Sequence, residues 1–226
     1  AEDQPGSGPH PEVEDAIHSI PAIIVVVKVL LLDNFDSFTY NLFHYLDGEG
    51  TEVTVRRNDA SDLFEGTFDG AVLSPGPGLP NESGQLMDFI RQRYDHLPIL
   101  GVCLGFQALI EYAGGSLFNL PEVYHGRPST CKIVLEDQLL KDVSNPFQVG
   151  RYHSWAVQPS TLPEAWKVTS MTRDIVMSAS HVSLPLYGVQ FHPESVLTPE
   201  GRKMIRNWLE SVRNFSMRVQ QDVVQQ

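Results

Sequence analysis

Short apolar runs alternate with amphipathic segments through the first half of the chain. The apolar runs predict buried strands at residues 28–32, 52–56, 68–73 and 98–102. The segments between them carry apolar residues at helical spacing and predict helices at residues 38–46, 82–93 and 104–113. Strands that alternate with helices pair in parallel through crossover connections, so this half predicts an open, mostly parallel α/β sheet flanked by helices.

The second half of the chain shows short apolar runs and few helical patterns until its end. These runs predict strands at residues 132–135, 147–152, 166–170, 175–180 and 186–191. We expect several of them to be antiparallel and to form a smaller extension of the main sheet. Residues 199–215 then predict an amphipathic helix whose apolar positions fit the helical period: Met204, Ile205, Trp208, Leu209 and Val212.

The two ends of the chain lack these patterns. The N-terminal part is rich in Pro, Gly, Glu and Asp, which is typical of segments that cannot bury a core. We expect a disordered tail or lead-in over residues 1–27, one domain over residues 28–215 and a frayed tail over residues 216–226. The apolar run at residues 23–32 is interrupted by a lysine and is shorter than the ~20 residues of a membrane-spanning helix.

Composition narrows the class of protein. The formal net charge of −12 over 226 residues argues against a nucleic-acid-binding protein, because such proteins carry a basic surface. The two cysteines, Cys103 and Cys131, are too few for a disulfide framework or a cysteine zinc site. We therefore expect a reducing compartment, the cytoplasm, and neither nucleic acid nor membrane as a partner.

One cysteine stands in a sequence context that suggests catalysis. Cys103 follows a predicted strand, precedes a predicted helix and is flanked by Gly101 and Gly105. This is the pattern of a nucleophile elbow, a turn too tight for a Cβ atom on either side. The N-terminus of the following helix would favour the thiolate of Cys103. Taken alone, the pattern also fits a packed turn without chemistry, and Cys131 lacks such a context and is interpreted as structural.

A base and an acid for this cysteine are predicted near the end of the fold. His192 follows the last predicted strand, and Pro193 holds the residue before it in an extended conformation. In an extended chain, residues two apart face the same way, so Glu194 can orient the imidazole of His192. Together with Cys103, these residues predict a Cys–His–acid triad.

Two further loops are expected beside this site. The polar loop at residues 33–37 and the Pro- and Gly-rich turn at residues 74–78 each follow a predicted strand, as Cys103 does. In open α/β sheets the ligand site lies beyond the carboxyl ends of the strands. The two loops and Cys103 should therefore lie on the same rim of the sheet.

At these positions the chain resembles a known family. The resemblance rests on residues 31–42, 73–78, 101–107, 151–154 and 188–195. The chain resembles the class I (triad) glutamine amidotransferases, which have a flavodoxin-like sheet. This resemblance extends from about Lys28 to Phe215. Within this family the chain is most similar to the glutaminase subunits, component II, of anthranilate synthase and aminodeoxychorismate synthase, and the segment at residues 31–42 carries this narrower match.

The resemblance implies a role for each matching residue. Cys103 would be the nucleophile, His192 the general acid/base and Glu194 the orienting acid. The oxyanion and glutamine-binding groups would be Gly76, Pro77, Gly78, Leu104, Gln107, His153 and Ser154. Phe106 stands where the family usually has His, and Trp155 stands where Leu is common, so we expect altered packing at the edge of the site.

The implied function is hydrolysis of glutamine through a glutamyl thioester. The ammonia would pass to a chorismate-binding synthase subunit, component I, docked at the rim that carries residues 33–37 and 74–78. We favour anthranilate synthesis for tryptophan over aminodeoxychorismate synthesis for p-aminobenzoate and folate. The remaining alternatives are a γ-glutamyl hydrolase without a partner and a non-catalytic subunit. No cofactor is expected on this chain, and Mg2+ would belong to the partner.

Overall fold

The computed structural model describes residues 26–224, so residues 1–25 of the expected N-terminal tail lie outside the described residues. The strands of the first half are β1 (Lys28–Asp33), β2 (Glu52–Arg57), β3 (Gly70–Leu73) and β4 (Ile99–Val102). Those of the second half are β5 (Leu117–Asn119), β6 (Arg127–Ile133), β7 (Phe147–Arg151), β8 (Trp155–Val157), β9 (Trp166–Thr172), β10 (Ile175–His181) and β11 (Leu186–Val189). The α-helices are α1 (Thr39–Asp47), α2 (Leu86–Arg93), α3 (Leu104–Tyr112) and α4 (Gly201–Val224).

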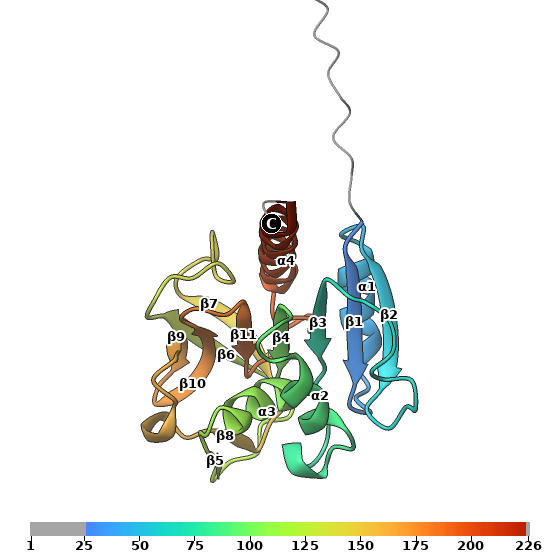
Figure 1. Cartoon of the computed structure of the whole chain (residues 1–226). Coiled ribbons are helices and arrows are strands. Elements are labelled where there is room, and N and C mark those ends of the chain that lie inside the picture. Colours follow the sequence, from blue (N-terminus) through green and yellow to red (C-terminus); the bar gives the residue numbers. More distant parts are fainter. Residues whose placement is uncertain (1–25, 225–226) are drawn as a thin grey trace, which may run out of the picture.

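One mixed sheet runs through the molecule in the strand order β2-β1-β3-β4-β11-β10-β9-β6-β7 (Figure 1). The strands from β2 to β11 pair in parallel, and those from β11 to β7 pair antiparallel. The predicted parallel sheet with an antiparallel extension is confirmed. The short strands β5 and β8 form a separate antiparallel pair that the apolar pattern did not predict.

Helices cover both faces of the parallel part. Along β1, Val29 and Leu31 pack in the cluster that contains residues of α1 and α4. Leu30 and Leu32 pack in the opposite cluster, with residues of α2 and α3. Because both faces are buried, β1 is apolar along most of its length, as parallel strands usually are.

The predicted helix at residues 82–93 starts later than expected. A 3₁₀ turn, Pro80–Glu82, comes first, and α2 begins only at Leu86. Gly84 separates them with φ +54°, and a Cβ atom there would lie 2.7 Å from Oδ1 of Asn58. The close approach of Asn58, in the loop after β2, to Gly84 therefore prevents a continuous helix, although the sequence of residues 82–93 has a helical pattern.

The last helix is longer than expected. The predicted end of the helix at residue 215 is wrong, since α4 continues to Val224 and includes most of the tail that was expected from residue 216. The chain between Gly201 and Val224 contains no further Gly and no Pro to end the helix. Val212 packs in the core, whereas Met217 and Val219 are exposed.

Of the helices in residues 26–224, none is long and apolar enough to cross a membrane.

Candidate active site

Cys103 occupies a sharp turn between β4 and α3. Its backbone has φ 51° and ψ −100°, a conformation that residues with a side chain rarely adopt. Its N–H donates a hydrogen bond to the carbonyl of Val189 at the end of β11 (2.7 Å). The predicted strand–turn–helix geometry is confirmed, and backbone strain at this position is typical of a nucleophile elbow.

The two flanking glycines are required by close packing. A Cβ atom on Gly101 would lie 2.6 Å from the backbone of Gly105, and one on Gly105 would lie 2.4 Å from the carbonyl oxygen of Leu73. Neither position has room for a side chain, as the sequence predicted. Because Gly101 and Gly105 have no side chains, α3 begins directly against β3 and β4. The free N–H groups of its first turn therefore lie beside Cys103.

The turn at residues 74–78 lies against the start of α3. A Cβ atom on Gly76 would lie 2.8 Å from Cδ2 of Leu104 and 2.6 Å from the carbonyl oxygen of Asn34. Asn34 is tied to the same turn, because its N–H donates to Oγ of Ser74 (2.8 Å) and its amide donates to the carbonyl of Ser74 (2.9 Å). The structure thus brings the loop after β1, the 74–78 turn and Leu104 together, as predicted for one rim.

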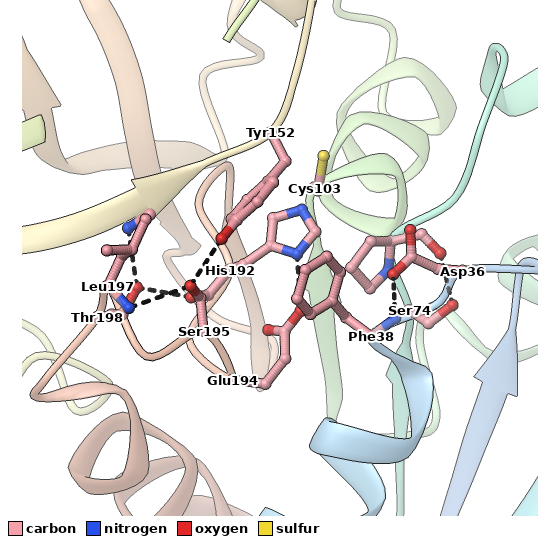
Figure 2. A network of polar contacts seen from close by, with 12 residues as sticks. Asp36, Phe38, Ser74, Cys103, Tyr152, His192, Glu194, Ser195, Leu197 and Thr198 are labelled. Atoms are coloured by element: carbon pink, nitrogen blue, oxygen red, sulfur yellow. Dashed lines mark hydrogen bonds and ion pairs between the residues drawn. The ribbon is translucent and has the colours of Figure 1, made fainter. Parts of the chain in front are cut away.

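His192 and Glu194 form a buried pair beyond the end of β11. Nδ1 of His192 donates to Oε1 of Glu194 over 2.7 Å, and both side chains are almost inaccessible to solvent (Figure 2). The backbone of His192 is held on both sides: its N–H donates to Gly150 (3.1 Å) and its carbonyl accepts from Thr198 Oγ1 (2.6 Å). The predicted pairing of Glu194 with His192 is confirmed, but the extended backbone expected there is wrong, because residues 193 and 194 form a turn in which the N–H of Ser195 donates to the carbonyl of His192 (3.2 Å).

The remaining ring nitrogen of His192 faces Cys103 (Figure 2). Nε2 has no hydrogen-bond partner among the described residues. Burial disfavours the charged ring, but interactions with Cys103 and Glu194 outweigh it and raise the pKa of His192. His192 can therefore carry a proton beside Cys103 while its other ring nitrogen is bonded to Glu194, the arrangement that nucleophilic acyl transfer needs.

Two aromatic rings hold the imidazole of His192. The ring of Tyr152 lies 4.7 Å and that of Phe38 lies 5.4 Å from it, measured between centroids. Tyr152 is fixed in turn by a hydrogen bond between its hydroxyl and Oγ of Ser195 (3.0 Å). The sequence did not indicate Phe38 and Tyr152 as part of the site. They lie far apart along the chain, and an aromatic residue by itself does not suggest a catalytic role.

Among the predicted glutamine-binding residues, Gln107 and His153 have side chains that face the protein, whereas Pro77 and Gly78 are exposed. Gln107 is 3% exposed, and its amide nitrogen donates to the carbonyl of Trp155 (2.9 Å) and to Oε1 of Gln190 (3.2 Å). His153 is 4% exposed, and Ser154, next to it, is half-buried. Any role of the Gln107 nitrogen or the His153 ring in binding glutamine is therefore to position neighbours.

His153 is held as a neutral imidazole. Its Nδ1 donates to the carbonyl of Trp155 (2.8 Å), and its Nε2 accepts from Nε of Arg151 (3.1 Å). These two bonds require one protonated and one unprotonated ring nitrogen. Burial and the charge of Arg151 lower the pKa of His153 from 6.5 to about 3, in agreement with this tautomer.

This neutral histidine should make the fold sensitive to acid. Between pH 6.5 and about 3 the unfolded chain binds a proton at residue 153 that the folded chain does not, so the free energy of unfolding falls with falling pH. We expect the contribution of His153 to drop by about 1.4 kcal/mol between pH 7.5 and pH 5.5. Urea unfolding of the parent and His153→Gln at both pH values measures it as the difference in pH dependence. Equal pH dependence in both proteins would contradict the prediction.

The two departures from the family pattern lie in different places. Phe106 is fully buried against β11, where a Cβ atom on Gly188 would lie 1.9 Å from its ring. The expectation that it alters the edge of the site is therefore wrong, since position 106 faces the core. Trp155 is half-buried, and it is its carbonyl that contacts Gln107 and His153.

The second cysteine is separate from this chemistry. Cys131 lies on β6 in the core, with Sγ 3.0 Å from Oγ1 of Thr172, and burial raises its pKa to about 11. Both cysteines are free. Within residues 26–224, no group of three His, Cys, Asp or Glu side chains is arranged to hold a metal ion.

Comparisons with known proteins place this geometry in context. The family model described as "Glutamine amidotransferase class-I" matches residues 30–212. The chain is 47% identical over 193 residues to anthranilate synthase component II of Haloarcula marismortui, covering 81% of this chain and 98% of the relative. It is 43% identical over 186 residues to aminodeoxychorismate synthase component 2 of Escherichia coli, covering 80% and 98%.

A third relative carries both activities in its name. It is the aminodeoxychorismate/anthranilate synthase component 2 of Bacillus subtilis, 39% identical over 189 residues, covering 82% of this chain and 97% of the relative. Among solved structures, a Thermoplasma acidophilum protein described as part of a GMP synthase has a TM-score of 0.78 and 22% identity, covering 86% of this chain and 98% of its own. This last likeness bears on the fold alone.

Proposed function

Because the chain belongs to the class-I glutamine amidotransferase family, we propose that it hydrolyses the side-chain amide of glutamine at Cys103 and supplies the ammonia to a chorismate-aminating synthase subunit. The observation that supports the proposal is that Cys103, in its strained turn, lies beside the buried His192–Glu194 pair (Figure 2). A nucleophile, a base and an orienting acid in this order are the parts of a Cys–His–acid triad.

The first half-reaction forms a thioester. The thiolate of Cys103 attacks the amide carbon of glutamine, and the carbonyl oxygen becomes an oxyanion. We assign its stabilisation to the N–H of Leu104 and to the turn at residues 76–78, which packs against Leu104. One such donor typically contributes about 3–4 kcal/mol to the transition state. When the C–N bond breaks, His192 donates its proton from Nε2 and the nitrogen leaves as ammonia.

The second half-reaction restores the enzyme. Neutral His192 takes a proton from a water molecule, whose oxygen attacks the thioester carbon. The C–S bond breaks, the sulfur leaves as thiolate beside the new imidazolium, and glutamate is released. Glu194 keeps the proton of the neutral ring on Nδ1, so that Nε2 faces the reacting atoms in both steps.

The chemistry of the product supports a partner. Ammonia released into water is protonated and loses its nucleophilicity, so a synthase subunit that receives it directly is needed. We place its docking face at the rim of residues 33–37 and 74–78. Two large apolar side chains support this location, because Phe35 is 50% exposed and Tyr40 is 62% exposed. We propose a cytoplasmic location, glutamine as substrate and no cofactor on this chain, with any Mg2+ on the partner.

We propose anthranilate synthesis, for tryptophan, as the pathway, supported by the name of the Haloarcula marismortui relative. Aminodeoxychorismate synthesis, for p-aminobenzoate and folate, is the second candidate, because two relatives carry that activity in their names. The partner subunit determines which product forms, since it holds chorismate.

Transfer of labelled nitrogen tests the proposal. The chain is mixed with component I of either synthase, chorismate, Mg2+, glutamine labelled at the amide nitrogen and unlabelled ammonium. We expect glutamate release, and label in anthranilate or aminodeoxychorismate with the matching partner. Glutamate release with no labelled product from either partner would instead support a hydrolase that acts alone.

A further inference from the structure

Gln190 contacts the sulfur of Cys103. It stands two residues before His192, and its side chain is fully buried. Its amide nitrogen Nε2 lies 3.5 Å from Sγ of Cys103, in hydrogen-bonding geometry. Neither the elbow motif nor the His-Pro-Glu motif assigns it a role.

The orientation of the Gln190 amide follows from its neighbours. The carbonyl of Trp155 can only accept, so the group of Gln107 that faces it is the donating NH2 (2.9 Å). The same NH2 donates to Gln190 over 3.2 Å, so the atom of Gln190 that receives it is the oxygen. The NH2 of Gln190 therefore faces Cys103, and the two amides cannot be reversed without losing these bonds.

The hydrogen bonds from the Trp155 carbonyl through Gln107 and Gln190 to Cys103 begin at a carbonyl that other residues hold in place. Trp155 lies on β8, whose pairing with Asn119 of β5 places its carbonyl. That carbonyl also accepts from Nδ1 of His153, whose other nitrogen accepts from Arg151. The series of hydrogen bonds thus connects Arg151 with the sulfur of Cys103 through groups that are at most half-exposed.

We propose that Gln190 is a further catalytic residue, which donates a hydrogen bond to the thiolate of Cys103. A donor to the charged sulfur favours thiolate over thiol, because a hydrogen bond to the charged form of a group stabilises that form. It also restricts the sulfur, which approaches the amide carbon of the substrate from a fixed side. The assignment rests on Cys103 being the nucleophile of the proposed function.

Alkylation of Cys103 as a function of pH tests the assignment without glutamine or a partner. Iodoacetamide reacts with thiolates, and peptide mapping separates Cys103 from the buried Cys131. Gln190→Leu keeps the approximate volume and removes the donor. We expect the pH midpoint of Cys103 alkylation to rise by about one unit, so that the rate below the midpoint falls about tenfold.

Gln148→Leu is the matched control, because Gln148 is an exposed residue of β7 that bonds only Thr130 through its amide nitrogen. Its midpoint should equal that of the parent. An unchanged midpoint in folded Gln190→Leu would overturn the assignment and leave Gln190 as a core residue.

A second measurement uses the unsubstituted chain, in case Gln190→Leu does not fold. The side-chain NH2 signals of Gln190, assigned by NMR, should move with the titration of Cys103 and should lose this response in Cys103→Ser. Signals that do not respond would also overturn the assignment. Failure of the proposed function is distinguishable, since it would appear as glutamine hydrolysis that survives alkylation of Cys103.

Discussion

Cys103→Ala is expected to lower glutamine hydrolysis by about 10,000-fold or more, the scale on which loss of a covalent nucleophile acts. The thioester cannot form without the sulfur, and the remaining groups can only bind glutamine and polarise its carbonyl. Because the side chain is 6% exposed and small, its loss should leave the fold intact. Glutamate release over time, with circular dichroism as a check on folding, measures the effect.

Cys131→Ala is the matched control for this substitution. It removes the other cysteine, which is fully buried on β6 and bonds Thr172, away from His192. We expect unchanged hydrolysis, with a moderate loss of stability from the buried cavity. If Cys103→Ala kept the activity of the parent, the assignment of the nucleophile would be wrong.

His192→Asn is expected to lower glutamine hydrolysis by about 1,000-fold, within the range of general acid–base catalysis. The variant loses the proton donor for ammonia and the base for water, and it loses the imidazolium that faces the sulfur. The parent holds that imidazolium because interactions with Cys103 and Glu194 raise the pKa of His192. The residual rate of the variant should therefore rise with pH, as the thiol ionises without help.

Rate–pH profiles of the parent and the variant measure this difference. His96→Asn is the control, since His96 is an exposed residue in the turn after α2. A variant with the same profile as the parent would show that another group transfers the proton. Accumulation of a glutamyl thioester, detected by mass spectrometry, would locate the defect in the second half-reaction.

Much of the candidate site could be predicted because its geometry is local. Gly101 and Gly105 lie two residues on either side of Cys103, so the turn they permit is readable from adjacent letters of the sequence. Pro193 lies between His192 and Glu194 in the same way, and these two side chains pair across a short turn in which the N–H of Ser195 donates to the carbonyl of His192 (3.2 Å). In both cases the residues that determine the geometry are direct neighbours in the chain.

Other features depended on contacts that no local pattern contains. The helix expected from residue 82 is interrupted by the approach of Asn58 to Gly84. His153 stands in a motif that suggested substrate binding, but Arg151 and the Trp155 carbonyl engage both of its ring nitrogens. Burial and long-range hydrogen bonds decide such cases.

By itself, the sequence determined the parts of this protein: strands and helices from their apolar periods, a strained turn at Cys103, and an oriented imidazole at His192. Only the tertiary structure decided that these parts meet. β11 adds to the sheet beside β4, with Gly188 opposite Gly101, although the antiparallel strands lie between them in the chain. Strand order arises from the packing of the whole sheet, and it is this order that brings His192, and Gln190 with it, to the sulfur.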